Sequence, residues 1–396
     1  AIYINPGQLS LDNTQILNSN GYGIYSDGSS SNINFVNQSK ISDANNGIII
    51  GSYNTLHIED SEISNISNYG INIINSNSQI NLINSSISDI GNDAVYSSTS
   101  YNDNNVNMHQ TIIKNISGDG IYLGSSDSEV IVDSSTIENC SQDGIQTYYS
   151  NSPITVSNTT VKNCDENGLY TNGENSIITV NNSRIIDNGY SGIYSAGSNA
   201  GARVVKSKIL NNGYHGVYAS QVPLICEYNL IANNGTSDSY RPIFVGGGSG
   251  SEVCKIHFST IIDNYSYSYF GNNVDVSNTI MWNNNSGSNQ YTGSLSSEYS
   301  TIQNFIGYDP EFIDTLGHVS SSSPTIDAAD PYYSDNYFPP GQGQLRADQG
   351  IYGGPDNNIW GEGNPDTSGE PAIHHIVDLP QDQGGFVGIQ YQGSAF

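Results

Sequence analysis

The segment Gly120–Asp143 reads GIYLGSSDSEVIVDSSTIENCSQD, and the equally long stretch after it, Gly144–Asn167, reads GIQTYYSNSPITVSNTTVKNCDEN. Both units open on a Gly-aliphatic pair and then carry aliphatic residues at alternate positions, such as Val130 and Val132. The opening pair recurs at a nearly constant interval: Gly23-Ile24, Gly47-Ile48, Gly70-Ile71, Ala94-Val95, Gly120-Ile121, Gly144-Ile145, Gly168-Leu169, Gly192-Ile193 and Gly216-Val217. A steady period of this kind indicates a solenoid of stacked units.

The aliphatic positions predict three short strands in each unit. A spacing of two residues places alternate side chains on one face of a strand, and β-branched residues suit a buried pleated surface. Helical repeats of similar length need Ala, Leu, Glu and Lys at a spacing of about 3.6 residues, which this chain does not offer. We therefore predict an all-β fold, a right-handed parallel β-helix with three short strands per coil of about 24 residues.

A polar ladder accompanies the repeat. Asn or Asp lies five residues before seven of the opening pairs, at Asn65, Asp89, Asn115, Asn139, Asn163, Asp187 and Asn211. Stacked turn amides bond to one another and to the turn backbone. We expect a structural asparagine ladder, in which a mutation loosens a turn and removes no activity.

The repeat becomes irregular from about residue 222, and a proline-rich tail of different composition begins near Ile306. The tail contains Asp309-Pro310-Glu311-Phe312-Ile313-Asp314, Ser323-Pro324-Thr325-Ile326-Asp327-Ala328 and Ala347-Asp348-Gln349-Gly350-Ile351-Tyr352-Gly353-Gly354. With these motifs the chain resembles, over nearly its whole length, the secreted bacterial right-handed parallel β-helix repeat proteins with a pectate-lyase-like solenoid. The motifs are typical of that architecture and of no particular activity. The resemblance implies a secreted, extracellular or cell-surface protein whose tail caps the last coils.

The domain boundaries follow from these changes. We predict a β-helix over residues 1–305, a capping segment packed on the last coils over 306–360, a linker over 361–370 and a β-strand extension over 371–396. The extension, PAIHHIVDLPQDQGGFVGIQYQGSAF, resembles the first strands of a fibronectin type III-like module. Val387, Ile389 and Tyr391 in it are candidates for assembly by strand donation. The first coil begins at once, after Ala1, which we interpret as a mature or trimmed start, and its open edge is a second candidate for assembly.

Composition limits the partners. The formal net charge of −28 disfavours nucleic acid and anionic membranes, and it argues against an anionic polysaccharide unless calcium bridges the two. No apolar run approaches the 18 or so residues of a membrane span, so we expect no membrane insertion.

Cysteines and aspartates occupy register positions. Cys140 and Cys164 are one repeat apart, hence on adjacent coils, and are candidates for a disulfide or for two stacked free thiols.

Asp93, Asp119 and Asp143 each directly precede an opening pair. Carboxylates about 4.8 Å apart repel one another, which raises a pKa or recruits a cation, so calcium is the candidate cofactor. The alternative is that Asp favours the turn before glycine.

A tyrosine stripe follows the opening pairs. Its candidate binding residues for a carbohydrate or a partner are Tyr96, Tyr122, Tyr170, Tyr194 and Tyr218, and Asn72 and Gln146 interrupt it. Because the preceding aliphatic residue points inward, these rings point outward. They are suited to stacking on sugar rings or on a protein, or else to packing on one another.

We assign no catalytic residue, because no nucleophile, phosphate-loop or redox motif is present. The leading hypothesis is an extracellular structural or adhesive protein that assembles end to end into surface filaments, with itself or a surface glycan as partner. One alternative is a carbohydrate-active enzyme, either a polysaccharide lyase or a glycoside hydrolase. Another is a glycan- or calcium-binding module.

Overall fold

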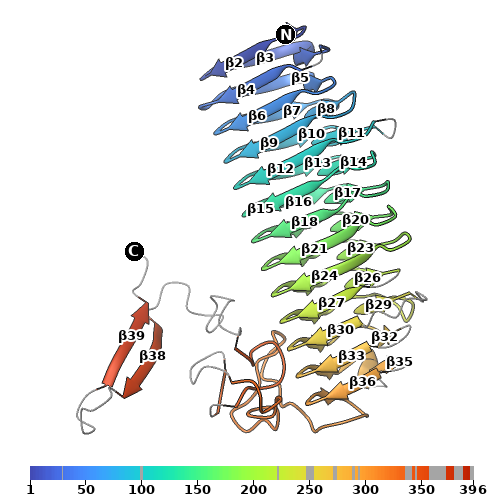
Figure 1. Cartoon of the computed structure of the whole chain (residues 1–396), viewed down its shortest axis with the longest axis vertical. Coiled ribbons are helices and arrows are strands. Elements are labelled where there is room, and N and C mark those ends of the chain that lie inside the picture. The colour runs from blue at the N-terminus through green and yellow to red at the C-terminus, as the bar shows by residue number, and fades with distance from the viewer. Residues whose placement is uncertain are drawn as a thin grey trace.

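The computed structural model describes residues 1–28, 30–98, 101–220, 223–246, 254–270, 274–287, 290–292, 295–334, 341–343, 346–355, 372–378 and 387–392. The chain winds into a right-handed parallel β-helix whose coils stack along one axis (Figure 1). The predicted fold class is confirmed.

Two sheets form the walls of the solenoid. Sheet B has thirteen parallel strands, one per coil: β2 (Gln8–Asp12), β4 (Asn32–Val36), β6 (Thr55–Glu59), β9 (Gln79–Ile83), β12 (Asn105–His109), β15 (Val130–Asp133), β18 (Ile154–Ser157), β21 (Ile177–Asn181), β24 (Gly201–Val205), β27 (Leu224–Glu227), β30 (Cys254–His257), β33 (Val274–Ser277) and β36 (Leu295–Glu298).

Sheet A contains two side-by-side stacks that are joined in the long strands β3 (Gln15–Ser26) and β5 (Lys40–Ile50). The first stack comprises β7 (Glu62–Ile66), β10 (Ser86–Ile90), β13 (Ile112–Ile116), β16 (Thr136–Cys140), β19 (Thr160–Lys162), β22 (Arg184–Ile186), β25 (Lys208–Leu210), β28 (Leu230–Ala232), β31 (Thr260–Ile262), β34 (Ile280–Trp282) and β37 (Thr301–Ile302). The second comprises β1 (Ile2–Ile4), β8 (Ile71–Ile73), β11 (Val95–Ser97), β14 (Ile121–Leu123), β17 (Ile145–Thr147), β20 (Leu169–Thr171), β23 (Ile193–Ser195), β26 (Val217–Ala219), β29 (Ile243–Val245), β32 (Ser268–Phe270) and β35 (Tyr291–Thr292). A 3₁₀ turn, η1, covers Asn284–Gly287.

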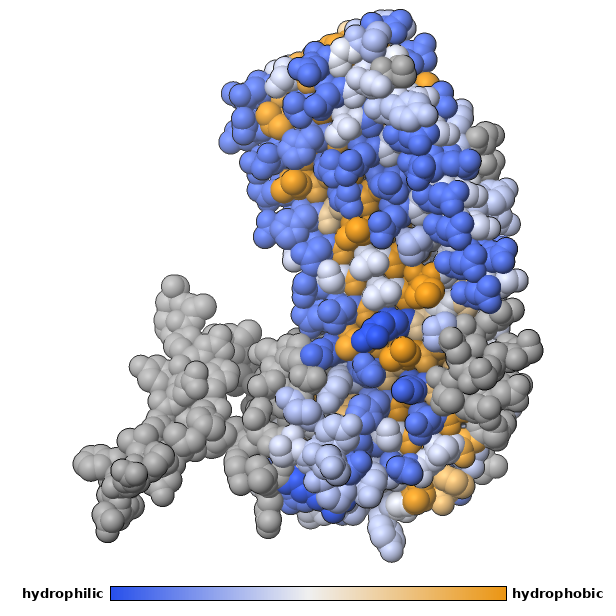
Figure 2. Space-filling model, viewed as in Figure 1, coloured by the Kyte–Doolittle hydropathy of each residue, from blue (hydrophilic) through white to orange (hydrophobic). Residues whose placement is uncertain are grey.

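The core is the inside of the solenoid. Along β15, Val130 and Val132 are buried while Ile131 and Asp133 are partly exposed, as the period of two predicts. One apolar cluster extends from Ile16 to Ile302. The face of the solenoid that Figure 2 shows is mostly hydrophilic, with apolar side chains between the polar ones. Within the described residues no helix is long and apolar enough to cross a membrane.

Each regular coil turns at three corners where a residue has the left-handed backbone conformation. In one coil these residues are Asn139 (φ 58°), Asn151 (φ 56°) and Asn158 (φ 50°). Asn and Asp tolerate this conformation better than other residues with a Cβ atom. The Asn139 amide donates to Asn115 Oδ1 at 3.1 Å and accepts from Asn163 Nδ2 at 3.3 Å. The predicted asparagine ladder is therefore confirmed.

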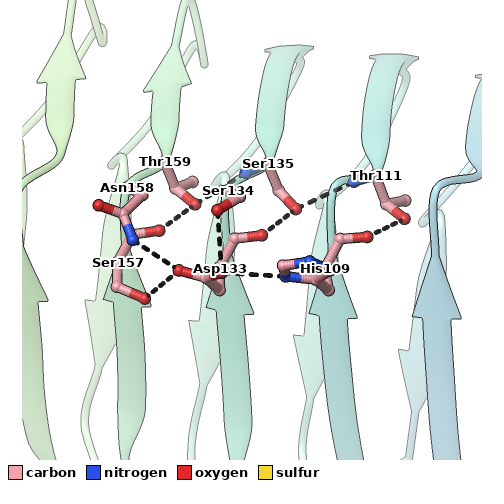
Figure 3. A network of polar contacts seen from close by, with 8 residues as sticks. All are labelled: His109, Thr111, Asp133, Ser134, Ser135, Ser157, Asn158 and Thr159. Atoms are coloured by element: carbon pink, nitrogen blue, oxygen red, sulfur yellow. Dashed lines mark hydrogen bonds and ion pairs between the residues drawn. The ribbon is translucent and has the colours of Figure 1, made fainter.

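Hydroxyl groups form a further ladder inside the corner between sheet B and the first stack. The Thr111 N–H donates to Ser135 Oγ, and the Ser135 N–H donates to Thr159 Oγ1, both at 3.1 Å (Figure 3). Because these residues are buried, the side chains replace water as acceptors for the corner amides.

A buried asparagine ladder, which we did not predict, runs down the later coils. It comprises Asn188, Asn212, Asn234, Asn264 and Asn284. Asn212 Oδ1 accepts both the N–H and the Nδ2 of Asn188, at 3.2 and 2.9 Å. The earlier coils have apolar residues at this position, of which the last two are Cys140 and Cys164.

Of the two alternatives for the cysteine pair, the structure has the stacked free thiols and not the disulfide. Cys140 and Cys164 are buried free thiols, and so are Cys226 and Cys254. The hydrogen bond between Cys140 and Cys164 and the burial of both raise the pKa of the Cys140 thiol. In-register side chains are separated by one strand spacing of about 4.8 Å, whereas the Cβ atoms of a disulfide are about 3.8 Å apart.

The tail after residue 305 packs against the outward face of the first stack. Ile351 is buried with Leu230, Ala232 and Ile262, and its N–H donates to Thr260 Oγ1 at 3.0 Å. In this region β28 and β31 are buried on both faces. The tail therefore covers a flank of the later coils.

The last described residues form an antiparallel pair, β38 (Ala372–Asp378) and β39 (Val387–Gln392). Val387, Ile389 and Tyr391 lie on β39, opposite Asp378, Ile376 and Ile373 of the same chain. The predicted linker 361–370 lies outside the described residues. The fibronectin-like interpretation and the role of these strands in assembly remain predictions.

Candidate functional site

A groove of about 490 Å³ lies over β17, β20, β23 and β26 of the second stack and the segments that lead into these strands. It brings together three of the predicted tyrosines, Tyr170, Tyr194 and Tyr218, with one predicted aspartate, Asp143. Tyr96, Tyr122, Asp93 and Asp119 belong to earlier coils and do not line it. The site is thus a section of the predicted stripe.

The first wall is the tyrosine stripe itself. Tyr170, Tyr194 and Tyr218 are in register on successive strands and are followed by Phe244 on β29. Their ring centroids are 5.5, 4.2 and 4.8 Å apart, and the planes are within 9° of parallel. The rings therefore pack on one another, which was the alternative interpretation of the stripe.

The second wall is a row of rings that the sequence interpretation missed. Tyr190, Tyr214 and Tyr240 line the groove from the segments before the strands, with centroids 4.5 and 3.9 Å apart. The signal was present, because Tyr190 and Tyr214 are one repeat apart. These tyrosines lie in the segments between strands, where the spacing of two that identifies a strand gives no guidance.

The stacking of the rings determines which parts of each tyrosine a ligand in the groove can contact. Rings in the middle of a stack have both faces covered, so they present edges and hydroxyl groups to the groove. Burial raises the pKa of Tyr170 and of Tyr218 to about 12. These hydroxyls remain protonated at neutral pH and can donate hydrogen bonds.

The floor is the ladder that begins with the predicted aspartates. Each side chain accepts the backbone N–H of the equivalent residue on the next coil: Asp119 N to Asp93 Oδ1 at 2.8 Å, Asp143 N to Asp119 Oδ1 at 2.7 Å, Asn167 N to Asp143 Oδ1 at 2.7 Å, Ser191 N to Asn167 Oδ1 at 3.1 Å and His215 N to Ser191 Oγ at 3.3 Å. The ladder therefore supports the fold by supplying acceptors to buried backbone N–H groups.

Burial changes the acidity of this ladder. It raises the pKa of Asp93 to about 6 and that of Asp143 to about 7. It also raises the pKa of Asp119 to about 8, with a smaller contribution from the charges of Asp143 and Asp93. Burial lowers the pKa of His215 to about 4, so its imidazole is neutral and accepts the Arg241 N–H at 3.0 Å.

The described residues do not form a cluster of ligands that would support the calcium hypothesis. Among the described residues no group of three or more His, Cys, Asp or Glu side chains is arranged to hold a metal ion. In the aspartate ladder, one oxygen of each carboxylate is used by a backbone N–H. Calcium binding at Asp93, Asp119 and Asp143 stays a prediction.

A polar network around Asp133 lies on the outer face of sheet B. Asp133 accepts from Ser157 Oγ at 2.6 Å and Asn158 Nδ2 at 2.8 Å on one oxygen, and from Ser134 Oγ at 2.9 Å on the other, which also lies 2.9 Å from His109 Nδ1 (Figure 3). These bonds, that of Ser157 first, lower the pKa of Asp133 to about 2. A carboxylate so fully bonded is a poor base, and the network is structural.

A second groove, of about 650 Å³, lies on the early coils beside the first stack. It is lined mainly by amides, hydroxyls and the ion pair of Lys40 and Glu62, whose atoms are 2.9 Å apart. Its described lining contains no aromatic residue. We therefore favour the tyrosine-lined groove as the site.

Comparison with known proteins agrees with the fold. Residues 1–126 and 69–222 match the family described as the right handed beta helix region. No curated protein matches the chain.

Similar solved structures include the pectate lyase Pel9A (12% identity, 88% of this chain and 86% of that chain, TM-score 0.36) and the periplasmic alginate epimerase AlgG (12%, 75% and 69%, 0.38). A third is the A-module of the Azotobacter vinelandii mannuronan C-5 epimerase AlgE6 (12%, 67% and 90%, 0.34). Likenesses this distant say nothing about the reaction or ligand of this chain.

Proposed function

The chain belongs to the right-handed β-helix family, and from that premise we propose that it is an extracellular, carbohydrate-active protein that binds a glycan in the tyrosine-lined groove. The observation that carries the proposal is the pairing of two tyrosine rows with a polar floor. Sugars present many hydroxyls around apolar ring faces, and they suit a groove that combines aromatic surface with a few convergent polar groups.

Conversion of the glycan is a second candidate function. Asp143 and Glu166 line the same groove, and glycoside hydrolysis requires a pair of carboxyl groups. Burial, with a further contribution from the charge of Glu166, holds the pKa of Asp143 near 7, so Asp143 is able to act as a general acid. The described residues that line this groove include no Lys or Arg to serve as a base, which favours a hydrolase over a lyase.

The structural and adhesive hypothesis, with end-to-end assembly, stays a prediction. This hypothesis is an alternative to glycan binding only if the groove is not the functional surface. Both interpretations agree with an extracellular location, which is part of the proposal.

The test of glycan binding is a substitution that removes one hydroxyl and preserves the stack. Tyr194→Phe should weaken binding of retained oligosaccharides by about three- to ten-fold, the worth of one hydrogen bond, in isothermal titration calorimetry. Tyr96→Phe, outside the groove, is the matched control and should bind like the unaltered protein. Equal affinities of the two variants, or no retention of any glycan, would refute the proposal.

Turnover is measured separately, as release of reducing ends. Asp143→Asn keeps an acceptor for the Asn167 N–H and should abolish release while the glycan still binds. A variant that releases reducing ends as fast as the parent excludes Asp143 as the acid.

A further inference from the structure

The tyrosine stripe is interrupted where the groove begins. On successive strands of the second stack, Tyr122 pairs with Gln146 and Gln146 pairs with Tyr170. Tyr122 stacks on Tyr96 and Tyr170 stacks on Tyr194, in each case on the side away from Gln146. Within the described residues each of these two rings has one face without a stacked ring, and the two faces look toward each other across the coil of Gln146.

The two rings beside the interruption lie well beyond stacking distance of each other. Adjacent parallel strands are about 4.8 Å apart, so Tyr122 and Tyr170 are separated by roughly 10 Å, twice the distance between stacked rings. On the strand between them the Gln146 side chain takes the place of a ring. Its amide lines the groove and makes no hydrogen bond with the described residues.

Polar and aromatic groups surround the interruption. Asp143 and Glu166 line the groove beside Gln146. Both donors to Asp143, the N–H and the Nδ2 of Asn167, bind Oδ1, which leaves Oδ2 for a ligand. The turn after β17 carries Tyr148 and Tyr149, which are 39% and 40% exposed and pack edge to face. Ring faces, an unused amide and a carboxylate thus converge on one coil.

The charges limit which sugar fits. Among the described residues, the groove lining contains Asp143 and Glu166 and no Lys or Arg, and the whole chain carries a formal charge of −28. A uronate carboxylate placed there would meet like charge, whereas an amine is attracted both to carboxylates and to tyrosine faces.

We propose that the interruption at Gln146 is the principal sugar position of the groove, and that its glycan is uncharged or carries amines in place of carboxylates. The inference rests on the proposed function and makes it more specific. Gln146 would bind the sugar edge and Tyr170 would cover one face, while Tyr122, on the strand just beyond the end of the groove, lies toward the other face.

The test is to fill the interruption. Gln146→Tyr continues the stack from Tyr96 to Tyr218, so it should keep or raise the melting temperature while it lowers glycan affinity at least about ten-fold. Asn72→Tyr is the control: it places a tyrosine at the other interruption of the stripe, outside the groove, where Tyr69 already stacks on Tyr96 at a centroid distance of 4.4 Å. It should leave affinity unchanged. Gln146→Ala, which removes only the amide, should cost a few-fold.

Three oligosaccharide probes of equal length separate the chemical classes: β-linked glucose, β-linked glucosamine and galacturonate. Binding of glucose or glucosamine oligomers that is lost in Gln146→Tyr supports the inference. Tightest binding of galacturonate overturns it, and so does equal affinity of Gln146→Tyr and Asn72→Tyr, although in both cases the proposed glycan binding would stand. Absence of binding by the unaltered protein would overturn both.

Discussion

At the scale of single residues, the fold depends on side chains that accept an unfavourable backbone conformation. The left-handed corners of the regular coils are occupied mainly by Asn and Asp. A residue with a Cβ atom loses roughly 1 to 2 kcal/mol in this conformation, and short polar side chains recover part of it through local hydrogen bonds. The corner composition is therefore a direct consequence of backbone sterics.

Substitutions of Asn139 separate the cost of the left-handed backbone conformation from the contribution of the amide ladder. Asn139→Ala should destabilise the chain by about 1 to 2 kcal/mol, because Ala tolerates φ of 58° poorly and lacks the ladder amide. Asn139→Gly loses the same amide but accommodates the backbone, so we expect a smaller loss in urea unfolding. Equal losses would show that the amide ladder, and not the backbone conformation, accounts for most of the stability at this corner.

Asp119 makes stability depend on pH. Its pKa is raised in the folded chain from 3.8 to about 8, so between these values the folded state binds more protons than the unfolded state. Its contribution to stability is therefore greatest below about pH 4 and is lost as the pH rises to about 8.

Asp119→Asn removes this titration and keeps the acceptor for the Asp143 N–H, as Asn167 does further along the ladder. One pKa unit corresponds to about 1.4 kcal/mol, so the variant should gain a few kcal/mol over the parent above pH 8 and differ little near pH 4. Melting curves across this range are the measurement. A difference that does not change with pH would contradict the assignment.

At the scale of strands and ladders, the inward and the outward rows of polar side chains contribute differently to the stability of the fold. Asn211 and Asn212 are neighbours, but Asn211 is exposed and Asn212 is buried. Asn212 Nδ2 donates to Ile185 O at 3.1 Å and to Asn234 Oδ1 at 2.9 Å, while its Oδ1 serves Asn188. A buried donor without an acceptor costs about 1 to 3 kcal/mol.

Asn212→Ala should therefore cost about 2 to 6 kcal/mol in chemical unfolding, since it removes the acceptor of two buried donors at once. Asn211→Ala, the matched control, should cost only about 1 to 2 kcal/mol. Similar values for the two would mean that water enters the coil and replaces the lost amide.

The strands were predictable from the sequence because their apolar spacing is periodic, and so was the outward stripe of Tyr170, Tyr194 and Tyr218. The buried asparagines were not, because a polar residue at an inward position contradicts the apolar pattern that identifies the strand. The second tyrosine row lies in connecting segments, where the period of two gives no guidance. The groove could not be foreseen because it requires both rows at once.

At the scale of the whole molecule, the described part of the tail covers one flank and contributes no residue to the lining of the groove. Strands covered on both faces, such as Leu230–Ala232 and Thr260–Ile262, read as continuous apolar or β-branched runs, whereas Thr160–Lys162 alternates. Such runs are the sequence signal of a covered flank.

Ile351→Asp tests whether the tail can detach from the solenoid while the solenoid stays folded. A carboxylate buried among Leu230, Ala232 and Ile262 should release the tail to limited proteolysis while the solenoid keeps its far-ultraviolet spectrum and the groove its affinity. Ile313→Asp, at a tail residue that is 68% exposed, is the control and should leave the proteolysis pattern unchanged. Loss of the β spectrum in Ile351→Asp would mean that tail and solenoid fold as one unit.

The floor of the groove has a consequence for how such a molecule evolves. Asp, Asn, Ser and His occupy its successive positions, and the backbone requires of them only an acceptor atom. A lineage can therefore exchange an acid for an amide, a hydroxyl or an imidazole by point mutation, coil by coil, without endangering the scaffold. The fold and the binding chemistry can therefore evolve independently, and relatives with the same coils are free to bind different polymers.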